Sequence, residues 1–158
     1  MNTAIIYGTK HGATHKCANT LANELGSYTK LYNLETESEI NLSEYDTIII
    51  GGSIHASAVN KNVKKFIDKN IDLLIQKNIG LYLCCMYEGD KALEQFGNAF
   101  PEELRNKATA HGLFGGEFDF EKMNFLEKAI VKKVANVEKS VSNLNYTNIK
   151  AFAKKLLK

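Results

Sequence analysis

The opening of the chain decides its fold: an apolar segment, Thr3-Ala4-Ile5-Ile6-Tyr7, runs directly into Gly8-Thr9-Lys10-His11-Gly12-Ala13-Thr14. Residues 13–25 then carry apolar side chains at spacings of one, three and four, which predicts a helix that ends at Gly26. The first N–H groups of a helix lack intrahelical partners, and the helix dipole favours an anion there. The segment therefore predicts a strand, a phosphate-binding loop at residues 9–14 and a helix.

The loop differs from the two best-known nucleotide-binding motifs. A Walker loop needs Gly-Lys followed by Ser or Thr, and a dinucleotide fingerprint needs three spaced glycines; both are absent from residues 8–14. The pattern that remains, Thr9-x-x-Gly12-x-Thr14, is rich in hydroxyl groups and suits a phosphate monoester held by neutral donors. Ordinary helix capping explains the same residues, so the loop by itself leaves both interpretations open.

Composition excludes several classes of protein. The chain has 158 residues, 44% of them hydrophobic, and a net charge of +2, as expected for a single domain spanning residues 1–158. No apolar run is long enough to span a bilayer, and no signal peptide is recognisable. The three cysteines lack metal-ligand spacing, so we expect buried thiols, no metal site and a cytoplasmic location. A single arginine, Arg105, argues against nucleic-acid binding.

Positive charge is concentrated near the C-terminus. From Glu121 onward, nine lysines accompany three glutamates. Such lysine-rich helices are either solvated surface or a surface that favours an anionic membrane or an acidic partner. The sequence leaves these alternatives open and does not predict an oligomeric state.

Strand-like and helix-like segments alternate along the chain. Strands are expected at 3–7, 28–34, 47–52, 79–86 and 109–115, and helices at 13–25, 60–76, 92–104, 122–137 and 148–157. This alternation predicts an α/β fold with a doubly wound, five-stranded parallel sheet and helices on both faces. In the strand order 2-1-3-4-5, the ends of strands 1, 3 and 4 meet at one edge, where such sheets bind ligands.

At this point the sequence resembles the flavodoxin family. The resemblance rests on the loop at residues 7–14, on Ile50-Gly51-Gly52-Ser53-Ile54-His55 after strand 3, and on the turn Tyr87-Glu88-Gly89-Asp90 after strand 4. The resemblance covers most of the chain, and the three motifs occur in the family's order. The resemblance implies a flavodoxin-like fold and FMN as cofactor.

A narrower resemblance is to the flavodoxin-like, menaquinone-dependent protoporphyrinogen dehydrogenases. It rests on the segment 50–55, on Phe114-Gly115-Gly116-Glu117 before a basic helix, and on Tyr146-Thr147-Asn148-Ile149. The chain departs from those enzymes in the short connection between residues 86 and 108, where they carry a long insertion.

The flavodoxin resemblance also implies roles for individual residues. The phosphate would lie in the loop formed by Thr9, Lys10, His11, Gly12, Ala13 and Thr14. The flavin ring would lie between two loops, the first comprising Ser53, Ile54, His55 and Ala56 and the second Met86, Tyr87, Glu88, Gly89 and Asp90. His55 and Tyr87 are the candidates for the two ring faces, while Glu88 and Asp90 would lower the reduction potential. No side chain is required as a catalytic acid or base.

The sequence thus predicts an FMN-binding redox protein that passes electrons to a quinone, a porphyrinogen or a redox partner protein. The flavin supplies the chemistry, and the protein orients it. A different class remains open: a flavodoxin-fold docking or regulatory module that binds no flavin.

Overall fold

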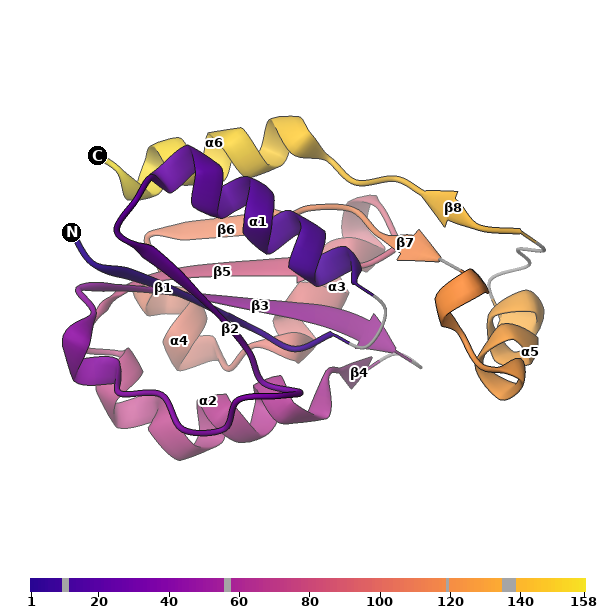
Figure 1. Ribbon diagram of the computed structural model, residues 1–158, viewed down its shortest axis with the longest axis horizontal. Coiled ribbons are helices and arrows are strands. Elements are labelled where there is room, and N and C mark those ends of the chain that lie inside the picture. The colour runs from indigo at the N-terminus through magenta and orange to yellow at the C-terminus, as the bar shows by residue number, and fades with distance from the viewer. Residues whose placement is uncertain (10–11, 56–57, 119, 135–138) are drawn as a thin grey trace.

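Five parallel strands form the central sheet in the order β2-β1-β3-β5-β6 (Figure 1). The computed structural model describes residues 1–158 apart from 10–11, 56–57, 119 and 135–138. The five strands are β1 (Thr3–Tyr7), β2 (Thr29–Asn33), β3 (Thr47–His55), β5 (Asn78–Cys84) and β6 (Ala110–Leu113). Numbered along the chain, these five have the predicted order 2-1-3-4-5, and the doubly wound α/β fold is confirmed.

Helices cover both faces of the sheet. On one face lie α1 (Ala13–Leu25) and α6 (Tyr146–Leu156); on the other lie α2 (Lys61–Leu74), α3 (Gly89–Ala99) and α4 (Glu102–Lys107) (Figure 1). Successive strand residues alternate between the two cores: Ile5 packs with α1 and α6, whereas Ile6 packs with α2. Because both faces of the three central strands β1, β3 and β5 are buried, these strands are largely apolar, as the β-branched run at residues 47–50 predicted.

Several element bounds differ from the sequence-based expectation. β5 ends at Cys84 rather than at residue 86, β6 ends at Leu113 rather than at residue 115, and the predicted helix at 92–104 is the two helices α3 and α4. The structure corrects the predicted loop at Ser53, Ile54 and His55, because β3 continues through His55. Ile54 and His55 pair antiparallel with Val59 and Ala58 of the unpredicted strand β4 (Ala58–Val59). Likewise, the predicted turn at Gly89 and Asp90 is the first turn of α3. A three-residue 3-10 helix, η1 (Leu42–Glu44), leads into β3.

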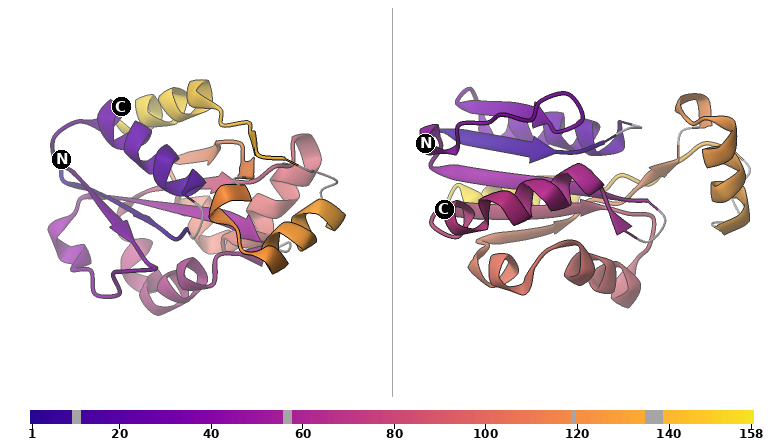
Figure 2. Two further views of the ribbon diagram at one scale, coloured as in Figure 1. Left: turned by 45° about the vertical axis from the view of Figure 1, so that its right-hand side comes forward. Right: turned by 90° about the horizontal axis from the view of Figure 1, so that it is seen from below.

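After β6 the chain leaves the sheet and forms an excursion at residues 117–142, which we call the arm. It contains β7 (Glu117–Phe118), η2 (Phe120–Lys122), α5 (Phe125–Val134) and β8 (Val141–Ser142), and β7 pairs antiparallel with β8. Figure 2 shows the arm beyond the carboxyl ends of the sheet strands, with α5 standing apart from the sheet. The predicted helix at 122–137 starts too early, because Asn124 Oδ1 accepts the N–H of Glu127 (2.8 Å) and caps α5.

Across the described ranges, no helix combines the length and the apolar content that a membrane span requires.

Candidate functional site

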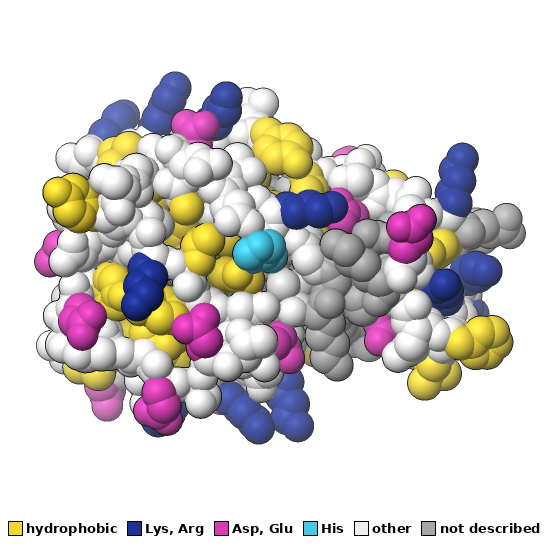
Figure 3. Space-filling model, in the orientation of Figure 1, with side chains coloured by type: hydrophobic (Ala, Val, Ile, Leu, Met, Phe, Trp, Pro, Cys, Tyr) yellow, Lys and Arg dark blue, Asp and Glu magenta, His cyan; other side chains and the backbone are white. Residues whose placement is uncertain are grey.

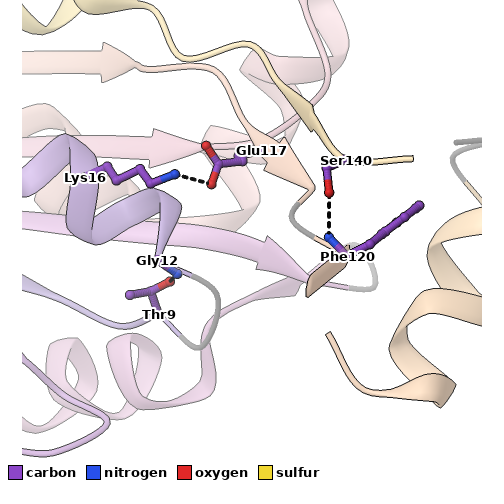
Figure 4. Close-up of polar contacts among 6 residues, drawn as sticks. All are labelled: Thr9, Gly12, Lys16, Glu117, Phe120 and Ser140. Carbon is purple, nitrogen blue, oxygen red and sulfur yellow. Dashed lines mark hydrogen bonds and ion pairs between the residues drawn. The ribbon is translucent and has the colours of Figure 1, made fainter. Parts of the chain in front are cut away.

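The loop between β1 and α1 folds back on itself through Thr9. The Thr9 side chain is buried, and its Oγ1 accepts the N–H of Gly12 at 3.1 Å (Figure 4). Gly12 has φ 91°, a left-handed conformation that a side chain would strain, and α1 begins at the next residue. Lys10 and His11, two predicted phosphate ligands, lie outside the described residues.

Helix α1 begins without a side-chain cap in the part of the loop that the structure describes. The Thr14 hydroxyl, in the first turn, is buried and has no oxygen or nitrogen partner among the described residues. The Thr14 side chain interacts with the Cys84 thiol of β5. Buried hydroxyl groups normally form hydrogen bonds, so this one is suited to donate to an anion above the helix start. Ala13 and Thr14 therefore fit a bound phosphate group.

The end of β3 forms the second wall of the site. Ser53 is buried, lies opposite Cys84 in the sheet register, and its carbonyl oxygen accepts the N–H of Asn60 at 3.0 Å. Ile54 is half-buried and packs against the core on the α2 face. Only the backbone of His55 is described, and Ala56 lies outside the described residues. This wall is held by β4 and by the start of α2.

The segment after β5 forms the third part of the edge. Met86 is half-buried, and Tyr87 is 38% exposed with the Lys91 Nζ 4.7 Å from its ring centroid. The Cys85 thiol donates to the Tyr87 carbonyl oxygen (3.7 Å), which ties the segment to the strand. Glu88, Gly89 and Asp90 are exposed, and Asp90 lies in the first turn of α3, where a carboxylate stabilises the helix.

The sheet register brings these three segments to one edge, because Tyr7 lies opposite Gly51 and Ser53 lies opposite Cys84. The predicted residues that the structure describes, from Thr9 to Asp90, therefore follow neighbouring parallel strands. The carboxyl edge can hold an elongated ligand with its anionic end at the start of α1.

Sequence reasoning missed one ion pair at this edge. Lys16 Nζ of α1 lies 2.7 Å from Glu117 Oε1 of β7, at the base of the arm (Figure 4). The Glu117 side chain is only 7% exposed, so the pair links the phosphate-loop helix to the arm. Nothing in the local pattern of either segment signals a contact across 101 residues.

A polar groove of about 420 Å³ beside the loop was also missed. It lies at the ends of β1 and β2, and its lining includes Tyr7, Thr9, His15 and Glu37. The Tyr7 hydroxyl lies 2.5 Å from His15 Nδ1, and the Asn19 amide lies 2.9 Å from Nε2 of the same ring. Burial, followed by the Glu37 charge, raises the pKa of Tyr7. These bonds hold the first turns of α1 against β1.

Two thiols lie beneath the site. Cys17 Sγ and Cys84 Sγ are 3.6 Å apart and buried, and neither forms a disulfide. The hydrogen bond to Cys17 and burial both raise the pKa of Cys84, so this thiol is a packing group rather than a nucleophile. Among the described residues, no group of three or more His, Cys, Asp or Glu side chains is arranged to hold a metal.

Comparison with known proteins identifies the family and the fold. Residues 4–145 match the family model described as the flavodoxin domain. No curated protein matches the chain.

Three solved structures illustrate the similarity. Oxidised Flavodoxin 1 from Bacillus cereus is 16% identical, with a TM-score of 0.62 over 99% of this chain and 97% of that one. Two-electron reduced flavodoxin from Megasphaera elsdenii is 14% identical, with a TM-score of 0.61 over 98% and 97%. A flavoprotein from Lactobacillus acidophilus in complex with FMN is 15% identical, with a TM-score of 0.50 over 73% and 91%. At these identities the three structures establish the fold.

Proposed function

The chain belongs to the flavodoxin domain family, and on that premise we propose that it binds FMN at the carboxyl edge of its sheet and transfers electrons. The observation that carries this proposal is the buried Thr14 hydroxyl, without an oxygen or nitrogen partner among the described residues, at the uncapped start of α1. A phosphate dianion at this position would accept hydrogen bonds from that hydroxyl and from the N–H groups of the first helical turn.

The phosphate end of FMN would be held by Thr9, Lys10, His11, Gly12, Ala13 and Thr14. Thr9 already shapes the loop through its bond to the Gly12 N–H, so it acts on the phosphate mainly by positioning that backbone. Lys10 and His11 would supply positive charge to the bound dianion.

The ring end would lie between the segment of Ser53, Ile54, His55 and Ala56 and the segment of Met86, Tyr87, Glu88, Gly89 and Asp90. Tyr87 is the exposed aromatic side chain of the second segment and is the natural stacking partner. Glu88 and Asp90, both exposed at this edge, would disfavour added negative charge on the ring. The bound flavin supplies the redox chemistry, and these residues orient it and set its electrostatic surroundings.

The acceptor that we propose is a redox partner protein or a small molecule of the quinone or porphyrinogen class. The resemblance of segments 50–55, 114–117 and 146–149 to protoporphyrinogen dehydrogenases supports the small-molecule class. Three free cysteines support a reducing, cytoplasmic location. We also propose that the lysine-rich C-terminal part of the chain contacts a membrane surface.

The purified protein tests the cofactor directly. We expect a yellow protein with a flavin absorption spectrum, which releases FMN rather than riboflavin when it is denatured. Reduction with dithionite, followed by a menaquinone analogue, a porphyrinogen or an electron-carrier protein, then identifies the acceptor by reoxidation of the flavin. A colourless protein that also fails to bind added FMN would contradict the proposal and favour a docking module.

A further inference from the structure

Helix α5 turns its apolar side away from the rest of the protein. Phe125, Leu126 and Ile130 are 88%, 67% and 47% exposed, and Ala129 is exposed beside them. Spacings of one, four and five residues place these four side chains on one face, which we call the α5 stripe. The opposite side of the helix carries Glu127, Lys128 and Val131, all of which are half-buried.

The α5 stripe differs from other exposed apolar side chains in the described chain. Tyr28 on the loop before β2 and Leu93 on α3 are 73% and 60% exposed, but each belongs to a different element. Isolated exposed apolar residues are ordinary, whereas a contiguous set on one element indicates an interaction surface. An amphipathic helix with its apolar face outward lacks its usual packing partner, so a partner outside the chain is expected.

Positive charge borders the stripe. Lys132 and Lys133 are exposed in the last turn of α5, and Lys139 is exposed beyond it. In Figure 3, dark-blue lysine side chains lie beside yellow apolar side chains at the end of the molecule that carries α5. The long stems of lysines allow their charges to reach past the apolar layer. Glu127, by contrast, lies on the opposite side of the helix, where its carboxylate accepts from Asn124 Nδ2 (2.9 Å).

The shape of the α5 stripe favours a membrane surface over a protein partner. α5 stands apart from the sheet, with the short η2 next to it in the arm (Figure 2), and the outer surface of a helix is convex. A protein partner would need a matching concave apolar groove, whereas the boundary between lipid headgroups and acyl chains adapts to any convex helix. Phenylalanine, leucine and isoleucine flanked by lysines are the composition of helices that lie in that boundary.

We propose that the α5 stripe docks the protein on an anionic membrane surface, with Phe125, Leu126 and Ile130 entering the headgroup boundary and Lys132 and Lys133 contacting anionic lipids. The arm lies at the carboxyl edge of the sheet, the edge at which we propose the flavin, so docking would bring that edge toward a lipid-soluble acceptor. We assign the proposed membrane contact to α5 and not to α6. The basic last turn of α6 (Lys154 and Lys155) lies at the opposite end of the molecule from the arm (Figure 1).

Co-sedimentation with lipid vesicles tests the proposal. The full-length protein should bind vesicles of phosphatidylglycerol and phosphatidylcholine, and should bind vesicles of phosphatidylcholine alone far more weakly. The double variant Phe125→Ser/Leu126→Ser should bind the anionic vesicles about tenfold more weakly or worse, since two large apolar side chains are removed. Lys132→Glu/Lys133→Glu should weaken binding by about tenfold or more, because two attractive charges become repulsive.

Two matched controls separate the α5 stripe from general effects of charge and hydrophobicity. Leu93→Ser removes an exposed apolar side chain from α3, and Lys154→Glu/Lys155→Glu reverses the same charge on α6. Both should bind anionic vesicles within about twofold of the unmodified protein. Thermal unfolding of each variant, followed by circular dichroism, verifies that it is folded.

Three results would overturn the proposal: no binding of the unmodified protein to anionic vesicles, equal losses in the controls and in the α5 variants, or a dimer in sedimentation equilibrium that Phe125→Ser/Leu126→Ser dissociates. The last result would identify the stripe as a contact between two copies. Vesicle binding is measured with and without added FMN. A protein that binds vesicles but not FMN would contradict only the cofactor proposal, and a protein that binds FMN but not vesicles would contradict only the membrane proposal.

Discussion

At the scale of single residues, Thr14 is the most important one for the proposed phosphate site. Its hydroxyl is buried, interacts with the weakly polar Cys84 thiol and has no oxygen or nitrogen partner among the described residues, while its carbonyl oxygen accepts the hydroxyl of Tyr82 at 3.2 Å. Burial of a hydroxyl without a good partner costs folding free energy. A ligand that accepts a hydrogen bond from this hydroxyl offsets that free-energy cost when it binds.

Thr14→Val should therefore weaken FMN binding without destabilising the ligand-free protein. Valine keeps the shape of the side chain and removes the hydroxyl, so FMN affinity should fall by about 1–2 kcal/mol, or about 5–30-fold. The free energy of unfolding without ligand should stay the same or rise by up to about 1 kcal/mol. Fluorescence titration with FMN and urea unfolding measure the two quantities.

Thr20→Val provides the matched control for this prediction. Thr20 lies on the same helix, but its hydroxyl donates to the Lys16 carbonyl oxygen (3.1 Å), away from the start of α1. Its substitution should leave FMN affinity unchanged. If Thr14→Val bound FMN as tightly as the unmodified protein, the Thr14 hydroxyl would belong to the core and not to a phosphate site.

At the scale of elements, the contact between α1 and β5 contains groups that must stay neutral. Tyr82 and Cys84 of β5 are buried beneath α1. Burial raises the pKa of Tyr82 well above its usual value, and the hydrogen bond to Cys17 followed by burial does the same for Cys84. In the unfolded chain both groups ionise at their ordinary values, about 8.5 for cysteine and about 10 for tyrosine.

Stability should therefore decline on the alkaline side. Below about pH 8.5, Tyr82 and Cys84 are neutral in both the folded and the unfolded protein, so their contribution to the free energy of unfolding is fully present. As the pH rises above the unfolded values, the unfolded chain loses protons that the folded protein retains, so the free energy of unfolding falls. Urea unfolding between pH 7 and 11 measures this decline.

Tyr82→Phe isolates one of the two groups. It removes the bond to the Thr14 carbonyl, which should cost about 1 kcal/mol at neutral pH. Above about pH 10 it should make the decline less steep, because a titrating group is gone. An unchanged slope in this variant would show that Tyr82 ionises as readily in the folded protein as in the unfolded chain.

Elements defined by local sequence were predicted well. β1 and α1 have the expected bounds, because the apolar run at 3–7 and the helical spacing at 13–25 are local signals. The extension of β3 through His55 and the pairing of β7 with β8 were missed, because both depend on partners that periodicity does not reveal. The start of α5 was misplaced because Asn124 was not recognised as a cap.

At the scale of the whole molecule, alternating strands and helices were enough to predict a doubly wound parallel sheet. The strand order 2-1-3-4-5, which gathers the three loops at one edge, agreed with the flavodoxin resemblance rather than following from the alternation. The same reasoning could not predict the ion pair between Lys16 and Glu117, which joins α1 to the arm. Nor could it predict that Phe125 and Leu126 face outward, because helical spacing identifies an apolar face without saying what that face contacts.

The loop at residues 9–14 is proposed to anchor a flavin by its phosphate group. The most direct test compares the affinities of the apoprotein for FMN and for riboflavin, which has the same ring but no phosphate. Because several charge-assisted hydrogen bonds depend on the phosphate, FMN should bind about 100-fold more tightly or better. Equal affinities for the two flavins, or binding of neither, would contradict the account.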